Sequence, residues 1–221
     1  FWGGIDDDRA KRMAELIVRY SRRDQLIEAY GRTPTKPFRY LPASGSIDPE
    51  AHAVFPFDMM EKVVERAGQI ALVHCACRAT AELIGRRACI HPLESCIKYD
   101  ELADYVIAQG IGREISKDEA LAILKEAETA GLVHLVDNAR EGIKHTCNCC
   151  GCCCWSVSTI GKRRIPRDVL MATYFLRETD QTRCTGCGLC VDSCPVKAID
   201  MDGDFPQIDR GWCIGCGLCA L

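Results

Sequence analysis

The spacing of apolar residues near the N-terminus predicts a long helix over residues 9–30. The apolar positions form one helical stripe, made of Met13, Leu16, Ile17, Tyr20 and Ile27. Asp6, Asp7 and Asp8 suit the positive end of the helix dipole, and Gly31 suits the other end of the helix. We interpret the stripe as a packing surface and not as a binding site.

Further apolar patterns predict alternating helices and strands as far as residue 177. Helices are expected at residues 57–67, 78–84, 99–109, 116–131 and 166–177, and strands at residues 69–74 and 132–136. The helix from Ser116 opens with a capping box, because Glu119 follows the serine by three positions. Residues 32–49 hold four prolines and Ser44-Gly45-Ser46, and they predict a connection with little regular structure.

A cysteine-rich stretch at residues 147–154 interrupts these patterns. Its thiols are Cys147, Cys149, Cys150, Cys152, Cys153 and Cys154. Successive side chains of an extended segment point to opposite sides, so Cys152 and Cys154 would face one way and Cys153 the other. Gly151 permits a turn that re-aims its neighbours. We interpret the stretch as a loop that supplies thiolates to metal centres on more than one side. A disulfide cluster is the alternative, but adjacent cysteines rarely satisfy the geometry of a bridge.

Four more cysteines precede this stretch. Cys75 and Cys77 follow the predicted strand and open the next helix, where backbone N–H groups and the helix dipole favour an anionic cluster. Cys89 and Cys96 follow in a predicted loop. These four thiols can supply one cluster, with buried structural cysteines as the alternative. One cubane needs four thiolates, so the ten cysteines up to residue 154 predict two centres. The central stretch can contribute to both.

The C-terminal tail carries two cysteine runs in register. The first has the complete pattern C-x2-C-x2-C-x3-C-P of bacterial ferredoxins, and the second repeats most of it. The runs are made of Cys184, Cys187, Cys190, Cys194, Cys213, Cys216 and Cys219. In a two-cluster ferredoxin the fourth cysteine of each run ligates the other cluster, so we expect Cys194 to join the second run. Zinc is the alternative, but a zinc site needs only paired Cys-x2-Cys units.

Composition narrows the class of protein. The chain has 221 residues, of which 17 are cysteines, and their spacings are those of metal sites and not of a secreted disulfide scaffold. We therefore expect a reducing, anaerobic cytoplasm. The net charge of −3 excludes a strongly basic nucleic-acid-binding face as a signal of composition. No apolar run approaches the roughly 20 residues of a membrane span. The chain begins at Phe1, and the second run lacks its last cysteine, so we expect both ends to be cut.

The tail resembles a bacterial ferredoxin domain with two [4Fe-4S] clusters. Together with Cys75-Ala-Cys-Arg, residues 109–121 and the Cys147–Cys154 stretch, it resembles a group of 4Fe-4S dicluster-domain proteins of anaerobes over about residues 48–221. The resemblance implies an α+β fold, with a mostly helical cysteine-rich domain before the ferredoxin-like one. The expected division is 1–47 for the N-terminal helix and proline-rich connection, 48–180 for the cysteine-rich domain and 181–221 for the tail. Two [4Fe-4S] clusters are expected in the tail and two upstream.

The function expected from these features is electron transfer within a larger anaerobic oxidoreductase complex. The expected partners are other redox subunits. We expect neither binding to nucleic acid nor a direct membrane span. A reductase whose own cluster at residues 147–154 binds a substrate is one alternative. Cys149-Cys150-Gly151 resembles the Cys-Cys-Gly signature of disulfide-reducing subunits, although the surrounding spacing differs. The second alternative is a redox-sensing regulator, because the predicted helix and strand at residues 116–136 are similar to half of a winged helix.

Overall fold

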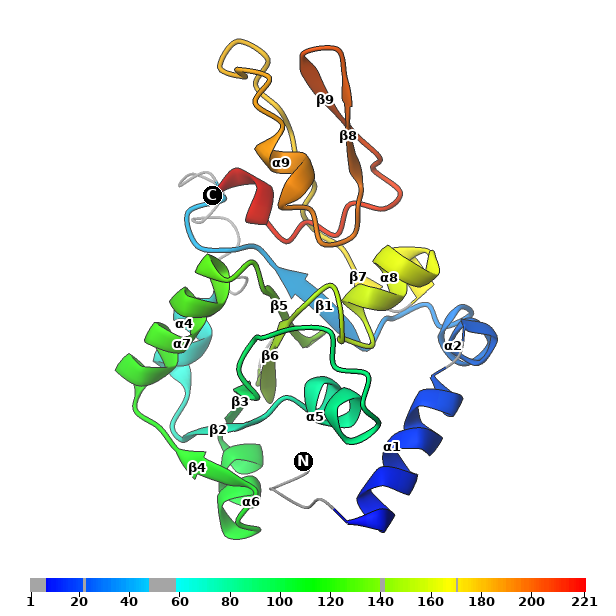
Figure 1. Cartoon of the computed structure of the whole chain (residues 1–221). Coiled ribbons are helices and arrows are strands. Elements are labelled where there is room, and N and C mark those ends of the chain that lie inside the picture. The colour runs from blue at the N-terminus through cyan, green and yellow to red at the C-terminus, as the bar shows by residue number, and fades with distance from the viewer. Residues whose placement is uncertain (1–6, 22, 48–58, 140–141, 170) are drawn as a thin grey trace.

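A computed structural model describes the chain except for residues 1–6, 22, 48–58, 140–141 and 170 (Figure 1). Its centre is a seven-stranded sheet with the strand order β4-β2-β3-β6-β5-β1-β7. Neighbouring strands are antiparallel except for the parallel pair of β1 and β7. In chain order the strands are β1 (Phe38–Leu41), β2 (Ile70–His74), β3 (Glu94–Tyr99), β4 (Gly112–Glu114), β5 (Val133–Asp137), β6 (His145–Cys149) and β7 (Met171–Ala172).

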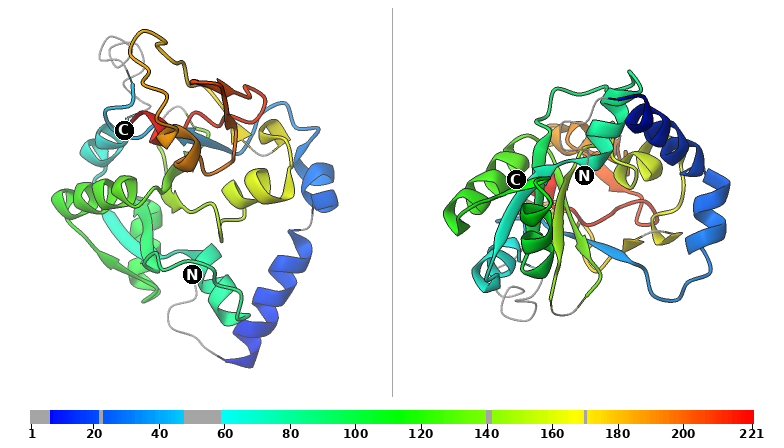
Figure 2. Two further views of the ribbon diagram at one scale, coloured as in Figure 1. Left: turned by 45° about the horizontal axis from the view of Figure 1, so that its top comes forward. Right: turned by 90° about the horizontal axis from the view of Figure 1, so that it is seen from below.

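Helices cover both faces of this sheet, in agreement with the expected mixture of helices and strands (Figures 1 and 2). Up to residue 163 they are α1 (Asp8–Tyr20), α2 (Arg23–Tyr30), α4 (Met60–Arg66), α5 (Ala76–Leu83), α6 (Glu101–Ala108), α7 (Lys117–Thr129) and α8 (Val157–Arg163). Helices α4 and α7 pack on one face, while α6 and α8 pack on the other. No helix in the described part of the chain is long and apolar enough to cross a membrane.

The two faces of the sheet differ in chemistry because side chains alternate along each strand. On β3, Ile97 and Tyr99 point into the apolar core under α4 and α7. Thr146 of β6 reaches the same side, where its hydroxyl lies 2.9 Å from the Tyr99 hydroxyl. Cys96 and Cys147, their neighbours along the strands, point to the opposite face. The cysteines of β3 and β6 therefore lie on one face of the sheet, which is here called the cysteine-bearing face.

The tail packs directly on the cysteine-bearing face. It contains α9 (Leu189–Asp192), the hairpin of β8 (Ile199–Asp202) and β9 (Phe205–Ile208), and the 3₁₀ turn η3 (Leu218–Ala220). One hydrophobic cluster contains Tyr40 of β1 and Leu135 of β5 together with Val196 and Ile214 of the tail. This cluster crosses both of the expected domain boundaries, at residues 47 and 180. The boundaries themselves stay predictions.

Several predicted elements are confirmed. The strands at residues 69–74 and 132–136 correspond to β2 and β5, and the helix at residues 78–84 corresponds to α5. The capping box is confirmed at the start of α7, where Ser116 Oγ accepts a hydrogen bond of 3.1 Å from the Glu119 backbone N–H. Asp6, which precedes the first expected helix, and Phe57, the expected start of the next one, lie outside the described residues.

The N-terminal prediction was wrong in two respects. The expected single helix is divided into α1 and α2 at Ser21, since residues 21–25 are all polar and interrupt the apolar stripe. The stripe was also expected to be buried, yet Met13, Leu16 and Tyr20 are exposed. Helix α1 buries Ala10 and Ala14 instead, because these small side chains allow a close approach of the helix.

Strand pairing overrides the local pattern elsewhere. Residues 166–177 form a 3₁₀ turn, η2 (Arg167–Val169), and the short strand β7 in place of the predicted helix, because β7 pairs with β1. The connection at residues 32–49 contains β1, which was not expected. Tyr99 ends β3 and does not begin a helix. Cys96, Cys147 and Cys149 lie in strands and not in loops.

A buried polar network connects α7 to β6 on the face away from the cysteines. The Glu128 carboxylate accepts a hydrogen bond from the Ser44 backbone N–H and lies 3.3 Å from His134 Nε2. His134 Nδ1 lies 2.7 Å from Asn148 Oδ1, and Asn148 Nδ2 donates to the Ser95 carbonyl at 2.8 Å. Burial opposes the charge of Glu128, but the hydrogen bonds from His134 and Ser44 lower its pKa to about 2. The stability contributed by the ionised carboxylate is thus complete above its ordinary pKa and is lost as the pH falls toward about 2.

Replacing the carboxylate tests this network. We expect Glu128→Ala to lower the free energy of unfolding by about 2–4 kcal/mol at neutral pH, because two buried groups lose their acceptor. Glu126→Ala is the matched control on the same helix, since Glu126 is exposed, and it should change stability by less than about 0.5 kcal/mol. Urea unfolding of the metal-loaded proteins measures both. Equal effects of the two substitutions would show that the network does not stabilise the fold.

Candidate metal centres

Six thiols converge on the cysteine-bearing face and form a closed ring of neighbours, here named the six-thiol centre. Each thiol shifts the pKa of two neighbouring thiols, in the order Cys75, Cys77, Cys154, Cys149, Cys147, Cys96 and back to Cys75. Cys75, Cys96, Cys149 and Cys154 are buried, while Cys77 and Cys147 are half-buried. The residues come from three separate segments, so only the folded chain brings them together.

Strand register explains how this centre forms. Cys96 of β3 is paired directly with Cys147 of β6, so their side chains lie on the same face. Cys149 lies two residues along β6 and therefore shares that face. Cys75 and Cys77 enter from the junction of β2 and α5, and the Cys75 N–H is held by the Leu93 carbonyl at 2.7 Å. The predicted turn from strand to helix thus places both thiols beside the sheet.

Two buried thiols of this centre, Cys75 and Cys96, retain their protons strongly. Hydrogen bonding with Cys147 and burial raise the pKa of Cys96 to about 12. Cys77 lowers the pKa of Cys75, but Cys96 and burial outweigh this effect and raise it to about 11. Several thiolates cannot share an apolar site without a cation that compensates their charge. A metal would supply that charge and displace the protons.

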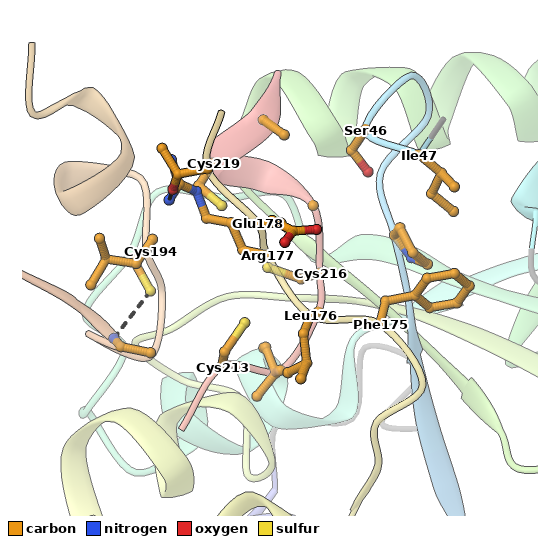
Figure 3. A pocket seen from close by; sticks show the side chains of 18 of the residues that line it. Ser46, Ile47, Phe175, Leu176, Arg177, Glu178, Cys194, Cys213, Cys216 and Cys219 are labelled. Carbon is orange, nitrogen blue, oxygen red and sulfur yellow. Dashed lines mark hydrogen bonds between the residues drawn. The ribbon is translucent and has the colours of Figure 1, made fainter. Parts of the chain in front are cut away.

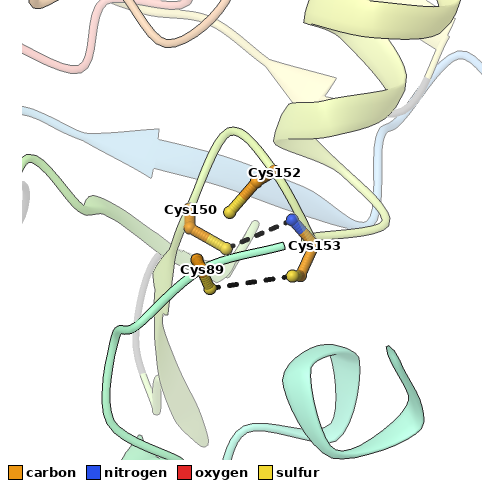
Figure 4. A group of neighbouring side chains, drawn as sticks. All are labelled: Cys89, Cys150, Cys152 and Cys153. Atoms are coloured by element: carbon orange, nitrogen blue, oxygen red, sulfur yellow. Dashed lines mark hydrogen bonds between the residues drawn. The ribbon is translucent and has the colours of Figure 1, made fainter. Parts of the chain in front are cut away.

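The remaining four upstream thiols form a second group, here named the four-thiol centre. Its sulfur atoms all lie within 4.8 Å of one another, and they belong to Cys89, Cys150, Cys152 and Cys153 (Figure 4). The Sγ atoms of Cys89 and Cys153 are 3.7 Å apart. The Cys153 backbone N–H donates to Cys150 Sγ at 3.3 Å. Cys89 comes from the loop between α5 and β3, whereas the other three follow β6 in a tight turn.

This grouping corrects the expected one. Cys89 does not join Cys75, Cys77 and Cys96, because it lies with the turn at residues 150–153. The expected alternation of Cys152 and Cys153 was also wrong, since residues 151–153 form a turn in which both thiols face the same group. The structure places the thiols of the stretch at 147–154 in two different groups, and the binding of metal by these groups stays a prediction. All seventeen cysteines are free, so the structure holds none of the disulfides of the alternative interpretation.

Arg78 lies between these two centres and was not singled out from the sequence. Its side chain is fully buried at 0% exposure. One terminal nitrogen, Nη1, donates to the Pro92 carbonyl at 2.8 Å and to Ser95 Oγ at 2.6 Å, while Nη2 donates to the Asn148 carbonyl at 2.8 Å. These bonds fix the guanidinium against β3 and β6.

The charge of Arg78 acts on both groups of thiols. Burial lowers the pKa of its guanidinium, but the thiolates of Cys75, Cys150 and Cys89 outweigh burial and raise it. A cation held near a thiolate-bound metal partly compensates the negative charge of the site and changes its reduction potential. The only signal of this residue in the sequence is its position next to Cys77, and its burial depends on the packing of α5.

In the tail, the structure brings Cys194 together with the second run. Cys194, Cys213, Cys216 and Cys219 line a cavity of about 930 Å³ (Figure 3). Burial and the neighbouring thiolates raise the pKa of Cys216 to about 12. The Ala198 N–H donates to Cys194 Sγ at 3.2 Å. This placement is the one that crossed ligation requires, and the ligation itself stays a prediction.

The other three tail cysteines are more open. Cys187 is exposed, while Cys184 and Cys190 are half-buried. The backbone N–H of Leu189 lowers the pKa of Cys187 most, and the Thr185 side chain lowers it further. Of these three thiols, Cys190 packs against the hydrophobic cluster that also contains Tyr40 and Leu135 of the sheet.

Close backbone contacts hold the second run against the rest of the chain. The Ala43 N–H donates to the Cys216 carbonyl at 2.9 Å. Gly215 and Gly217 have positive φ angles of 67° and 76°. A Cβ atom at Gly215 would lie 2.1 Å from the Phe175 carbonyl oxygen, so only glycine fits there.

Tyr40 lies between the six-thiol centre and this tail set. It is 1% exposed, and its hydroxyl lies 2.9 Å from Ser156 Oγ. Burial raises its pKa well above the ordinary value, the bond with Ser156 lowers it, and the thiolates of Cys154, Cys149 and Cys216 raise it further. The pKa of Tyr40 therefore depends on thiolates of both sites. Sequence analysis missed this residue because β1 itself was not expected.

Comparisons with known proteins match the iron–sulfur tail. The model of the 4Fe-4S binding domain matches residues 178–200. Over 40 residues the chain is 45% identical to one subunit of the ion-translocating oxidoreductase complex of Methanosarcina acetivorans. That match covers 18% of this chain and 15% of the relative, so the chain spans only a small part of that protein. No solved structure matches.

Paired cysteine variants test the crossed arrangement of the tail. We expect Cys194→Ala to remove the cluster of the second run, because its thiol lies with those of Cys213, Cys216 and Cys219. Cys187→Ala should remove the other cluster, and each variant should lose about four irons per chain. Electron paramagnetic resonance of the reduced proteins distinguishes the two losses. If both variants lose the same signal, the tail is not ligated in the crossed way.

Proposed function

We propose that this chain transfers electrons between iron–sulfur centres as a subunit or module of an oxidoreductase complex. Electrons pass between the tail clusters and the six-thiol centre. The match of the tail to a 4Fe-4S binding domain and to part of an oxidoreductase subunit supports the general function. The partners are other redox subunits.

One observation carries this proposal: a continuous apolar core joins the two sites. Cys149 and Cys154 of the six-thiol centre belong to the same hydrophobic cluster as Cys194, Cys213 and Cys216 of the tail. Tyr40 fills the space between them. Electron transfer is fast only over short separations, and a dry surrounding reduces the solvent rearrangement that each transfer requires. The packing favours transfer inside the chain.

Burial favours a relay over a substrate-reducing enzyme at the six-thiol centre. Four of its six thiols are buried, and the sheet covers one side of the group. A substrate would need an open path to the reacting metal. The regulator alternative finds less support, since the strand after α7 is not part of an exposed wing. It pairs on both edges inside the seven-stranded sheet, with β6 and with β1.

The seventeen free thiols favour a reducing compartment, and we propose the cytoplasm of an anaerobe as the setting. Anaerobic purification with the natural partners identifies the donor and the acceptor. Co-purification of redox subunits supports the proposal, whereas a chain that binds none and undergoes no reversible reduction contradicts it.

Substitution of Tyr40 tests the path inside the chain. We expect Tyr40→Ala to slow electron transfer between the tail and the six-thiol centre severalfold, because the ring is replaced by a cavity. Tyr40→Phe is the matched control: it keeps the ring, loses only the contact with Ser156, and should retain most of the rate. Rapid mixing with a low-potential donor, followed by freezing and electron paramagnetic resonance, gives the two reduction rates separately. An unchanged rate in a Tyr40→Ala protein with full metal content would exclude this path.

A further inference from the structure

We infer that the four-thiol centre binds a single thiophilic metal ion, zinc by chemical class, in tetrahedral coordination and not an iron–sulfur cubane. This site is formed by Cys89, Cys150, Cys152 and Cys153, and it is separate from the proposed electron relay. Its ion has a structural role: it connects the loop before β3 to the turn after β6.

The separation of the sulfur atoms carries this inference. All four lie within 4.8 Å of one another, and the distance from Cys89 Sγ to Cys153 Sγ is 3.7 Å. Zinc binds thiolates at about 2.3 Å, which places neighbouring sulfurs of a tetrahedron about 3.8 Å apart. In a cubane each thiolate binds a different iron, and sulfides separate the irons, so the thiolates must stand farther apart than this. The four sulfurs therefore enclose the space of one ion.

The six-thiol centre has a different geometry. Its six thiols form a closed ring in which each interacts mainly with two neighbours. Within the described residues, no other set of three or more cysteine, histidine or acidic side chains fulfils the distances for one ion. The ten upstream thiols thus divide into a compact set of four and a wider ring of six.

The surroundings provide what a tetrathiolate ion requires. Four thiolates and one divalent cation carry a net charge of −2, which must be compensated near a buried site. The charge of the buried Arg78 acts on the Cys150 thiolate, and the Cys153 N–H donates to the same sulfur at 3.3 Å. Hydrogen bonds of this kind orient the ligands and stabilise thiolate charge.

The local fold explains why an ion is needed here. Residues 86–92 have no regular structure, and Ile90 is 99% exposed. The apolar cluster around the site has only three buried members, Ala127, Leu132 and Cys150. Metal coordination supplies stability where a core of this size does not. The turn it holds also contacts the tail, because a Cβ atom at Gly151 would lie 3.0 Å from the Pro195 carbonyl oxygen.

Metal and sulfide analysis of the full chain, purified anaerobically, tests the inference. We expect about one zinc, or one iron in excess of sulfide, per chain in addition to the iron–sulfur content. Cys89→Ser should lose that ion and keep the iron and sulfide of the other centres. Cys96→Ser is the matched control from the six-thiol ring, and it should lose iron and sulfide while keeping the single ion. A loss of about four irons with their sulfides from Cys89→Ser would overturn the inference.

X-ray absorption of the unmodified protein keeps the test independent of variant folding. At the zinc edge we expect one shell of four sulfurs at about 2.3 Å. If iron occupies the site, the same shell should account for the iron in excess of sulfide. A protein that contains neither zinc nor iron in excess of sulfide would also overturn the inference.

Discussion

The pairing of β6 with β3 is the interaction on which the centres of this protein depend. It places Cys96 opposite Cys147 on one face of the sheet, and Thr146 beside Tyr99 on the other. A shift of this register by one residue would move Cys147 and Cys149 into the apolar core under α7. The same strand then ends in a turn, so the chain directs its next thiols to a different group. One strand and one turn thus divide thiols that are neighbours in sequence between two groups.

The charge of so many thiolates is the second constraint on the fold. Buried thiolates are unfavourable without cations or hydrogen-bond donors beside them. Arg78 meets this requirement for both upstream groups, and its own position is fixed by carbonyls of the loop before β3 and of β6. The polar network around Glu128 and Asn148 holds the opposite face of β6. Polar groups on both faces therefore hold the strand that presents Cys147 and Cys149.

The tail is integrated with the sheet and is not an independent appendage. Gly161 of α8 and Gly151 of the turn both lie against the backbone of Pro195, the residue after Cys194. In the segment after β1, the Ala43 N–H donates a hydrogen bond to the Cys216 carbonyl. A cluster held by the tail thus has structural contacts to both upstream groups. This arrangement is compatible with both proposals, the relay path through Tyr40 and the metal-held turn at residues 151–153.

The sequence by itself determined the chemistry and the local elements: the ferredoxin spacing of the tail, the richness in thiols, the strand before Cys75 and the capped helix at Ser116. These features depend on neighbours within a few positions, so periodicity and spacing reveal them. Only the tertiary structure decided which thiols share a centre, because Cys89, Cys96 and Cys154 find their neighbours through strand register and a turn. The roles of Arg78 and Tyr40 could not be predicted from the sequence either. A single arginine or tyrosine belongs to no local pattern, and only long-range packing buries these two side chains between groups of thiols. The short strands β1 and β7 could not be predicted for the same reason. Their residues pair across more than a hundred positions of the chain, and no local pattern indicates so distant a partner.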